Sequence, residues 1–166
     1  MERRKKEDEK SKEIRIILHD IRSTHNVGSM FRTADAAGVS TIYVTGYTPA
    51  PVDQFGRKRK DIAKTALGAE ESVPWEKVSN ISQLMSRLKK DGFQITAVEQ
   101  SKRSVDYKKV KLHKKSVLIV GNEVSGISTK ILNNCDVVAE IPMRGIKESL
   151  NVSVAFGVAL FRFLDM

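Results

Sequence analysis

Residues 116–126 read SVLIVGNEVSG, an apolar run that passes directly into a glycine-rich turn. The first half of this stretch, Ser116 to Val120, is a short apolar run rich in β-branched residues, which predicts a buried strand. Its second half is a glycine-rich turn that contains a carboxylate, Glu123. Ligands of open α/β proteins lie at the carboxyl ends of the strands, so this turn is a candidate binding loop.

The turn does not match a phosphate-binding loop. Gly121 and Gly126 have the spacing of the two P-loop glycines, but a P-loop continues with Lys and Ser or Thr, whereas Ile127-Ser128 follow here. The G-x-G-x-x-G fingerprint is absent as well. The turn alone leaves two interpretations open: a tight structural turn capped by its own polar side chains, or a ligand-binding loop.

Two more polar clusters stand where predicted strands end. Asn26-x-Gly28-x-x-x-Arg32 follows a predicted strand at 14–18 and its exit loop at 19–25, with Asn26 as the expected N-cap of a helix. The third cluster runs from Ile141-Pro142-Met143 through 149–153, with Ser149 as the expected cap of the closing helix and Asn151 inside its first turn. Taken alone, Asn26 is an ordinary cap and Arg32 an ordinary surface arginine.

The remaining pattern alternates between strands and helices. Strands are predicted at 14–18, 41–45, 93–99, 116–120 and 137–141, helices at 26–37, 61–67, 81–90 and 150–164, and loops at 49–59 and 75–79. The alternation predicts an α/β fold with a mostly parallel sheet flanked by helices. The closing helix is expected to pack inward through Leu150, Val154, Gly157, Val158 and Phe161, with Gly157 allowing close approach of another backbone. Residues 1–13, which are charged and almost without apolar side chains, predict a flexible tail before one domain at 14–166.

The charge of the chain favours a polyanionic partner. The 166 residues carry a formal net charge of +9, and the sequence pI is near 9.7. Nucleic acid is the commonest such partner, although a charge that only keeps the protein in solution is the alternative. Basic residues cluster at Arg57-Lys58-Arg59-Lys60 and again within 102–115, and for each cluster a solvated charged face is the alternative.

The sequence gives little support for a disulfide-bonded, metal-binding, membrane or secreted protein. The single cysteine, Cys135, excludes an internal disulfide and is expected to pack as a small apolar residue. The three histidines are scattered, so no metal site is predicted. No apolar run approaches the ~20 residues that cross a bilayer, and the charged N-terminus lacks the apolar core of a secretory signal. A cytoplasmic location without membrane contact is therefore expected.

Read together and in order, the three clusters are recognisable. The chain resembles the SpoU/TrmH-type RNA ribose 2′-O-methyltransferases of the SPOUT superfamily over about residues 14–164. The stretch Lys64 to Glu70, KTALGAE, also looks like a segment of that family. The resemblance implies a C-terminal trefoil knot, an exception to the rule that chains are unknotted. It also implies a homodimer whose site is completed across the interface, with the closing helix as part of that interface.

The resemblance further implies a reaction. S-adenosyl-L-methionine would bind at Val98, Gly121, Ile141 and Leu150, and its methyl group would pass to a ribose 2′-hydroxyl of tRNA or rRNA without a metal. Arg32 would activate that hydroxyl or, because a guanidinium resists deprotonation, position the ribose phosphate.

Supporting roles follow for the other motif residues. Asn26 would hold the backbone or substrate near Arg32, and Glu123 would bond the neighbouring loop and offset the cofactor's positive charge. Ser149 and Asn151 would line the acceptor side. The predicted substrate contacts are Arg22, His25, Arg57, Lys58, Arg59, Lys60 and Arg144.

Two alternatives belong to other functional classes. A non-catalytic RNA-binding module that kept the knotted fold would be expected to lose Arg32 or the pattern Gly121, Ile141, Leu150, and neither is lost. A different nucleotide-binding α/β domain is disfavoured by the missing phosphate-loop motifs.

Overall fold

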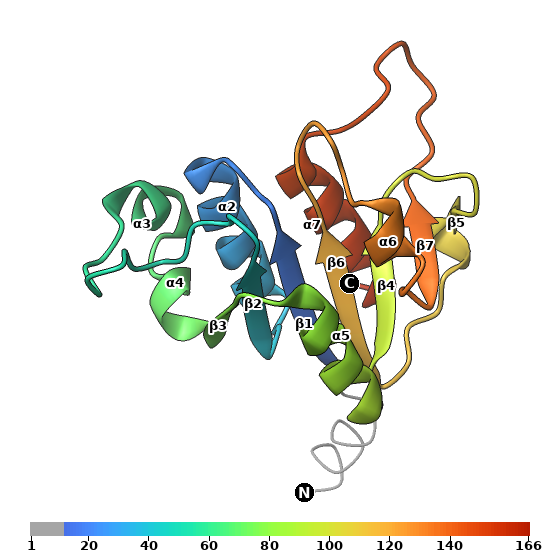
Figure 1. Cartoon of the computed structure of the whole chain (residues 1–166). Coiled ribbons are helices and arrows are strands. Elements are labelled where there is room, and N and C mark those ends of the chain that lie inside the picture. The colour runs from blue at the N-terminus through green and yellow to red at the C-terminus, as the bar shows by residue number, and fades with distance from the viewer. Residues whose placement is uncertain (1–11) are drawn as a thin grey trace, which may run out of the picture.

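A seven-stranded sheet runs through the computed structural model, which describes residues 12–166 (Figure 1). The strand order is β3-β2-β1-β6-β4-β7-β5, and every adjacent pair is parallel, which confirms the predicted α/β fold with a parallel sheet. The strands are β1 (Glu13–His19), β2 (Thr41–Thr45), β3 (Trp75–Val78), β4 (Gln94–Val98), β5 (Val105–Asp106), β6 (Lys115–Val120) and β7 (Val137–Glu140).

Helices cover both faces of the sheet and close two cores. One core lies between the sheet and α2, α3, α4 and α7, and the other lies under α5 and α6. Cys135 is buried in the second core, as predicted, and this burial raises the pKa of its thiol to about 11. The helices are α2 (Thr24–Ala36), α3 (Lys60–Ala66), α4 (Ala69–Ser72), α5 (Ile81–Lys90), α6 (Thr129–Leu132) and α7 (Val152–Phe163), with a 3-10 turn η1 (Tyr107–Lys109). Within residues 12–166, no helix is long and apolar enough to cross a membrane.

The strand order brings loops that are distant in sequence to one edge of the sheet. β6 lies between β1 and β4, with Leu18 beside Val120 and Ala97 beside Ile119, and β7 lies on the other side of β4. Because all of these strands are parallel, the loops that follow them leave the same carboxyl edge. The predicted trefoil knot stays a prediction.

Several short elements differ from the sequence prediction. Residues 75–79, predicted as a loop, contain the edge strand β3; only Trp75 and Val78 are partly buried, so the strand shows too little apolar pattern to be recognised. β5 lies inside the basic segment 102–115 and was not predicted. The predicted tail falls mostly outside the described residues, and Glu13 is already the first residue of β1.

Two helices begin at other residues than predicted. α2 begins after Ser23, whose hydroxyl accepts a hydrogen bond from the Asn26 backbone N–H, so Asn26 is not the N-cap. α7 is capped by Asn151, which accepts from the Ser153 N–H at 2.9 Å, so Ser149 is not the cap. Both stretches contain several residues that cap well, and local sequence does not choose among them.

The inward face of α7 was also predicted wrongly. Phe156, Ala159, Leu160 and Phe163 are buried, whereas Leu150, Val154 and Val158 are 39%, 50% and 39% exposed. The helix is apolar on every side, so the pattern does not determine its rotation. The nearest group to a Cβ built at Gly157 is the Thr33 side chain of α2, at 3.6 Å, rather than another backbone.

Candidate functional site

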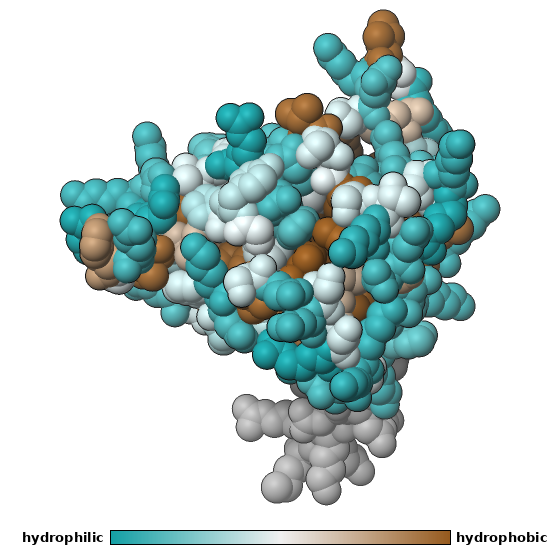
Figure 2. All heavy atoms as spheres, viewed as in Figure 1, coloured by the Kyte–Doolittle hydropathy of each residue, from teal (hydrophilic) through white to brown (hydrophobic). Residues whose placement is uncertain are grey.

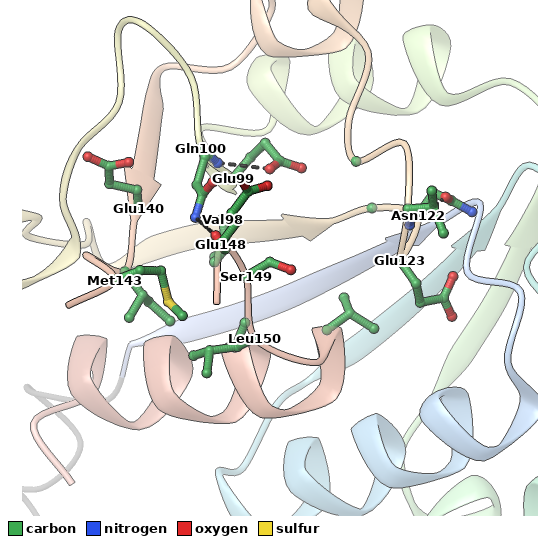
Figure 3. Close-up of a pocket in the computed structure, with 16 residues that line it drawn as sticks. Val98, Glu99, Gln100, Asn122, Glu123, Glu140, Met143, Glu148, Ser149 and Leu150 are labelled. Atoms are coloured by element: carbon green, nitrogen blue, oxygen red, sulfur yellow. Dashed lines mark hydrogen bonds between the residues drawn. The ribbon is translucent and has the colours of Figure 1, made fainter. Parts of the chain in front are cut away.

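A pocket with a volume of about 300 Å³ opens at the carboxyl edge of the sheet (Figure 3). Its walls come from the loops after β4, β6 and β7 and from the beginning of α7. This volume is at the lower end of the range for small-ligand sites. The four residues predicted to contact a cofactor, Val98, Gly121, Ile141 and Leu150, all line it.

The pocket has a charge opposite to that of the chain. Four carboxylates line it, and among residues 12–166 none of the lining side chains is Lys, Arg or His. The chain as a whole carries +9. Apolar groups, including Met143 and Leu150, occupy one side of the pocket in Figure 3, and Glu123 lies at the end that faces α2. The arrangement favours a ligand that is partly apolar and positively charged. The four carboxylates belong to Glu99, Glu123, Glu140 and Glu148.

Glu123 joins the loop after β6 to the start of α2. Its carboxylate accepts hydrogen bonds from the backbone N–H groups of Arg22 and Ser23, both at 3.1 Å, and from the Asn26 side-chain amide at 3.2 Å. Partial burial of Glu123 raises its pKa, but the hydrogen bonds that its carboxylate accepts, from backbone N–H groups and from Asn26, together outweigh this effect, and the net pKa is lowered. The glutamate is therefore ionised at neutral pH and holds the two loops together.

Asn26 extends this network to the third motif. Its Oδ1 accepts a hydrogen bond from the Asn151 side-chain amide at 3.3 Å, and Asn151 caps α7. Glu123, Asn26 and Asn151 thus form one chain of hydrogen bonds across the three motifs. In each of these bonds an amide N–H donates to a carboxylate or amide oxygen, and the network holds the loops around the pocket.

The loop after β4 contributes polar residues that the sequence interpretation missed. Glu99 accepts hydrogen bonds from the Ile127 N–H at 3.0 Å and from the Gln100 N–H at 2.8 Å. The Gln100 side chain donates to the Glu148 carbonyl at 2.7 Å, which ties the loop after β4 to the loop after β7 (Figure 3). Their position directly after Val98 was the signal that could have identified them.

The motif glycines permit close packing inside the protein. A Cβ built at Gly121 would lie 2.5 Å from the Ile127 side chain and 2.9 Å from the Gly126 carbonyl oxygen. A Cβ at Gly28 would lie 2.4 Å from the Ile62 carbonyl oxygen, so Gly28 lets α2 approach α3. Substitution of either glycine would therefore disturb the fold.

The remaining residues predicted for catalysis lie at two different places. Ser149 is exposed and lines the pocket. Arg32 is exposed on α2, does not line the pocket, and makes no hydrogen bond or ion pair within the described part of the chain. Arg32 directly precedes Thr33, the residue through which α2 meets Gly157 of α7.

The loop residues predicted to contact substrate are exposed around the same edge. Arg22 donates its backbone N–H to Glu123 and leaves its side chain exposed. His25 belongs to the first turn of α2 rather than to the exit loop. Arg144 lies in the segment 141–151, which projects from the body of the molecule above β7 and α7 in Figure 1.

The basic cluster at 57–60 is largely paired with acids. Arg57 contacts Asp53 at 2.7 Å, Lys58 contacts Glu71 at 2.6 Å and Glu70 at 3.3 Å, and Arg59 contacts Asp61 at 3.3 Å. Lys60 makes no ion pair within residues 12–166. The cluster thus presents less net positive charge than its sequence indicates.

Comparison with known proteins places these features in a family. A profile of the SpoU rRNA Methylase family matches residues 13–161. The chain is 37% identical over 154 residues to the tRNA (guanosine(18)-2'-O)-methyltransferase of Aquifex aeolicus, covering 93% of this chain and 70% of that protein. It is 35% identical over 145 residues to the 23S rRNA (guanosine-2'-O-)-methyltransferase RlmB of Neisseria meningitidis, covering 87% of this chain and 55% of that protein. The chain thus spans only part of the length of these relatives.

Solved structures agree with the sequence relatives. The A. aeolicus TrmH/SpoU tRNA modifying enzyme matches with a TM-score of 0.81 and 34% identity, over 93% of this chain and 75% of that one. An AdoMet-bound rRNA methyltransferase from Sinorhizobium meliloti matches with a TM-score of 0.83 and 29% identity, over 93% and 56% of the two chains. The resemblance read from the three motifs is confirmed: the chain belongs to the SpoU rRNA methylase family.

Proposed function

We propose that this chain transfers a methyl group from S-adenosyl-L-methionine to a ribose 2′-hydroxyl of tRNA or rRNA. The observation that carries the proposal is the acidic pocket in a basic chain: four carboxylates and no basic side chain among the described lining residues, in a protein of net charge +9. A phosphate-bearing nucleotide would be repelled there, whereas a ligand with a sulfonium and an ammonium group would be attracted. The names of the two relatives support an RNA ribose as the acceptor.

The residues of the pocket fit the cofactor. Val98, Ile141 and Leu150 provide apolar contact for an adenine ring, and the four carboxylates complement its positive charges. S-adenosyl-L-methionine, when bound, supplies an electrophilic methyl group. The chain's own contribution is to orient the reactants and to place charge, because a ribose hydroxyl is a weak nucleophile. The hydrogen bonds of Glu123 and Gln100 hold the loops for that purpose.

We further propose a homodimer that completes the site. The exposed apolar side chains of α7, with Val154 50% and Val158 39% exposed, form a face that a second copy would cover. Arg32 is exposed on α2, the helix that packs against α7, and does not line its own chain's pocket. In a dimer that buries α7, Arg32 of one protomer would lie next to the interface and would reach the substrate together with the partner's pocket.

Arg32 would act on the acceptor side. Its five N–H donors suit a ribose phosphate, and its positive charge favours the developing alkoxide. Either role is consistent with its exposure and with the lack of a carboxylate partner among the described residues. A cytoplasmic location and the trefoil knot remain predictions of the same proposal.

Two measurements test the proposed function. Calorimetry should detect binding of S-adenosyl-L-methionine and of its demethylated product to the purified protein without added metal. Mass spectrometry of nucleosides from tRNA and rRNA should show one 2′-O-methylated nucleoside that disappears when the gene is deleted. A folded dimer that binds neither cofactor form would refute the cofactor assignment, and unchanged nucleosides would refute the acceptor.

A further inference from the structure

Residues 51–59, between β2 and α3, form a rigid hairpin. Its tip is a turn in which the Gly56 N–H donates to the Asp53 carbonyl at 3.0 Å, and Gly56 adopts a positive φ of 76°. The strands of the hairpin are joined by the Val52–Lys58 bridge and by the Arg59 N–H, which donates to the Pro51 carbonyl at 2.9 Å. The backbone of the tip is therefore held in one conformation.

This hairpin displays an aromatic ring to solvent. Phe55 is 70% exposed, and its neighbour Arg57 places its guanidinium 4.9 Å from the ring centroid. The Asp53 carboxylate fixes both residues: it accepts from the Phe55 N–H at 2.8 Å, the Arg57 N–H at 2.9 Å and the Arg57 side chain at 2.7 Å. Asp53 therefore holds the ring and the guanidinium next to each other on the solvent side of the hairpin.

We infer that the Phe55 ring and the Arg57 guanidinium form a stacking platform for an unpaired base of the RNA substrate. The inference rests on the RNA part of the proposed function and names a contact that the three motifs do not contain. Proteins read single-stranded RNA by stacking bases on aromatic rings and on arginine planes, and the hairpin presents both, preorganised. Because every base has a flat face, the platform would anchor the RNA without selecting a sequence.

The surroundings of the ring favour RNA over a second protein copy. Lys60 at the start and Lys64 in the last turn of the adjacent α3 are exposed and make no ion pair within residues 12–166. In Figure 2, a small group of apolar residues is surrounded by hydrophilic ones at the left end of the molecule, where Figure 1 places the hairpin. An isolated ring among charged groups suits a nucleotide, whereas a protein interface needs a broader apolar patch.

The hairpin contacts a different part of the RNA from the pocket. It leaves the carboxyl end of β2, on the same edge of the sheet as the pocket loops, but extends to the far side of α2 and α3 in Figure 1. The stacked base is therefore distinct from a nucleotide held at the pocket of the same protomer. The platform would set the position of the RNA on the enzyme, and its loss would change binding rather than the chemical step.

Fluorescence anisotropy with a labelled short oligoadenylate, at low salt, tests the inference on the full chain. Phe55→Ala should weaken binding by about 5- to 150-fold, the range measured when a stacking aromatic residue is removed. Phe55→Trp should retain binding, and its indole emission should be quenched by the RNA beyond the signal of the native Trp75. Phe55→Leu, which is apolar but has no aromatic face, should bind as weakly as Phe55→Ala.

Matched controls separate the possible outcomes. Gln54→Ala, an exposed substitution on the same turn, should not alter binding, and thermal melting should show that all variants remain folded. Equal affinity of Phe55→Ala and wild type would overturn the inference. So would a variant whose sedimentation changes while its RNA affinity does not, because the ring would then contact protein. If wild type binds RNA but fails to methylate it, the proposed function fails while a loss of binding in Phe55→Ala still supports the platform. No RNA binding by wild type would overturn both.

Discussion

Replacement of Glu123 by glutamine tests the hydrogen-bond network that joins the motifs. The carboxylate accepts three N–H groups, from Arg22, Ser23 and Asn26. A glutamine has one acceptor oxygen and an amide nitrogen that itself donates, so at least one of the three N–H groups loses its partner. A hydrogen bond to a charged group contributes about 1.5–3 kcal/mol. Because Arg22 is exposed and water can replace part of the loss, we expect Glu123→Gln to lower the free energy of unfolding by about 1–2 kcal/mol.

The loss of stability in Glu123→Gln should become smaller as the pH falls. The pKa of Glu123 is lowered in the folded protein, so its carboxylate stabilises the fold fully above the ordinary pKa of a glutamate. This contribution is lost as the pH falls through the folded-state pKa. The stability difference between wild type and Glu123→Gln should therefore shrink in acid, since the amide does not titrate.

Urea denaturation at several pH values measures both quantities. At neutral pH the midpoint of Glu123→Gln should be about 0.5–1 M lower than that of wild type. Glu148→Gln is the matched control, because Glu148 also lines the pocket but its carboxylate accepts no hydrogen bond within the described residues. A Glu123→Gln protein as stable as wild type at neutral pH, or a difference that grows in acid, would refute the reasoning.

Four further predictions concern function. Arg32→Ala should abolish methyl transfer with cofactor affinity nearly unchanged, and Arg32→Lys should rescue poorly because a point charge does not replace a bidentate fork; a near-normal single-turnover rate in Arg32→Ala would contradict this role. Val154→Asp should convert the dimer to monomers in sedimentation equilibrium and stop methyl transfer, and a dimeric variant would place the interface elsewhere. Lys60→Ala should reduce the salt slope of RNA binding by about 0.7–0.9, whereas Arg57→Ala should change the slope less because Arg57 is paired with an acid; equal slopes would show that the pairing does not persist. Gly121→Val should lower thermal stability as well as cofactor affinity, since its side chain meets protein atoms, and an unchanged melting temperature would argue against that clash.

The buried strands could be predicted from the sequence because each one has a recognisable pattern within its own few residues. β1, β2, β6 and β7 are short apolar runs bounded by turn residues, and this pattern is characteristic of strands covered on both faces. β3 was not predicted because it is an edge strand with mostly exposed side chains, and such a strand needs few apolar residues. The rotation of α7 escaped because the helix is apolar on all sides, and only its partners decide which side is buried.

The residues of the pocket were predictable, but the contacts among them were not. Gly121 follows a predicted strand, Ile141 ends one and Leu150 begins the predicted closing helix, and these positions place all three at the carboxyl edge. The bond between Asn26 and Glu123 spans nearly a hundred residues and exists because β6 pairs with β1. Strand order is a property of the whole fold, which no local pattern encodes.

The division of charge explains how one small chain could hold two ligands of opposite sign. The acids Glu99, Glu123, Glu140 and Glu148 are gathered inside the pocket, whereas much of the positive charge lies on exposed side chains outside it. In the proposed reaction, an RNA drawn to the surface would be kept out of the pocket by the carboxylates, and a cationic cofactor would be drawn in. At the boundary, the backbone of Arg22 bonds Glu123 while its side chain faces solvent. The acceptor and the cofactor would thereby be directed to adjacent places without competing for one site.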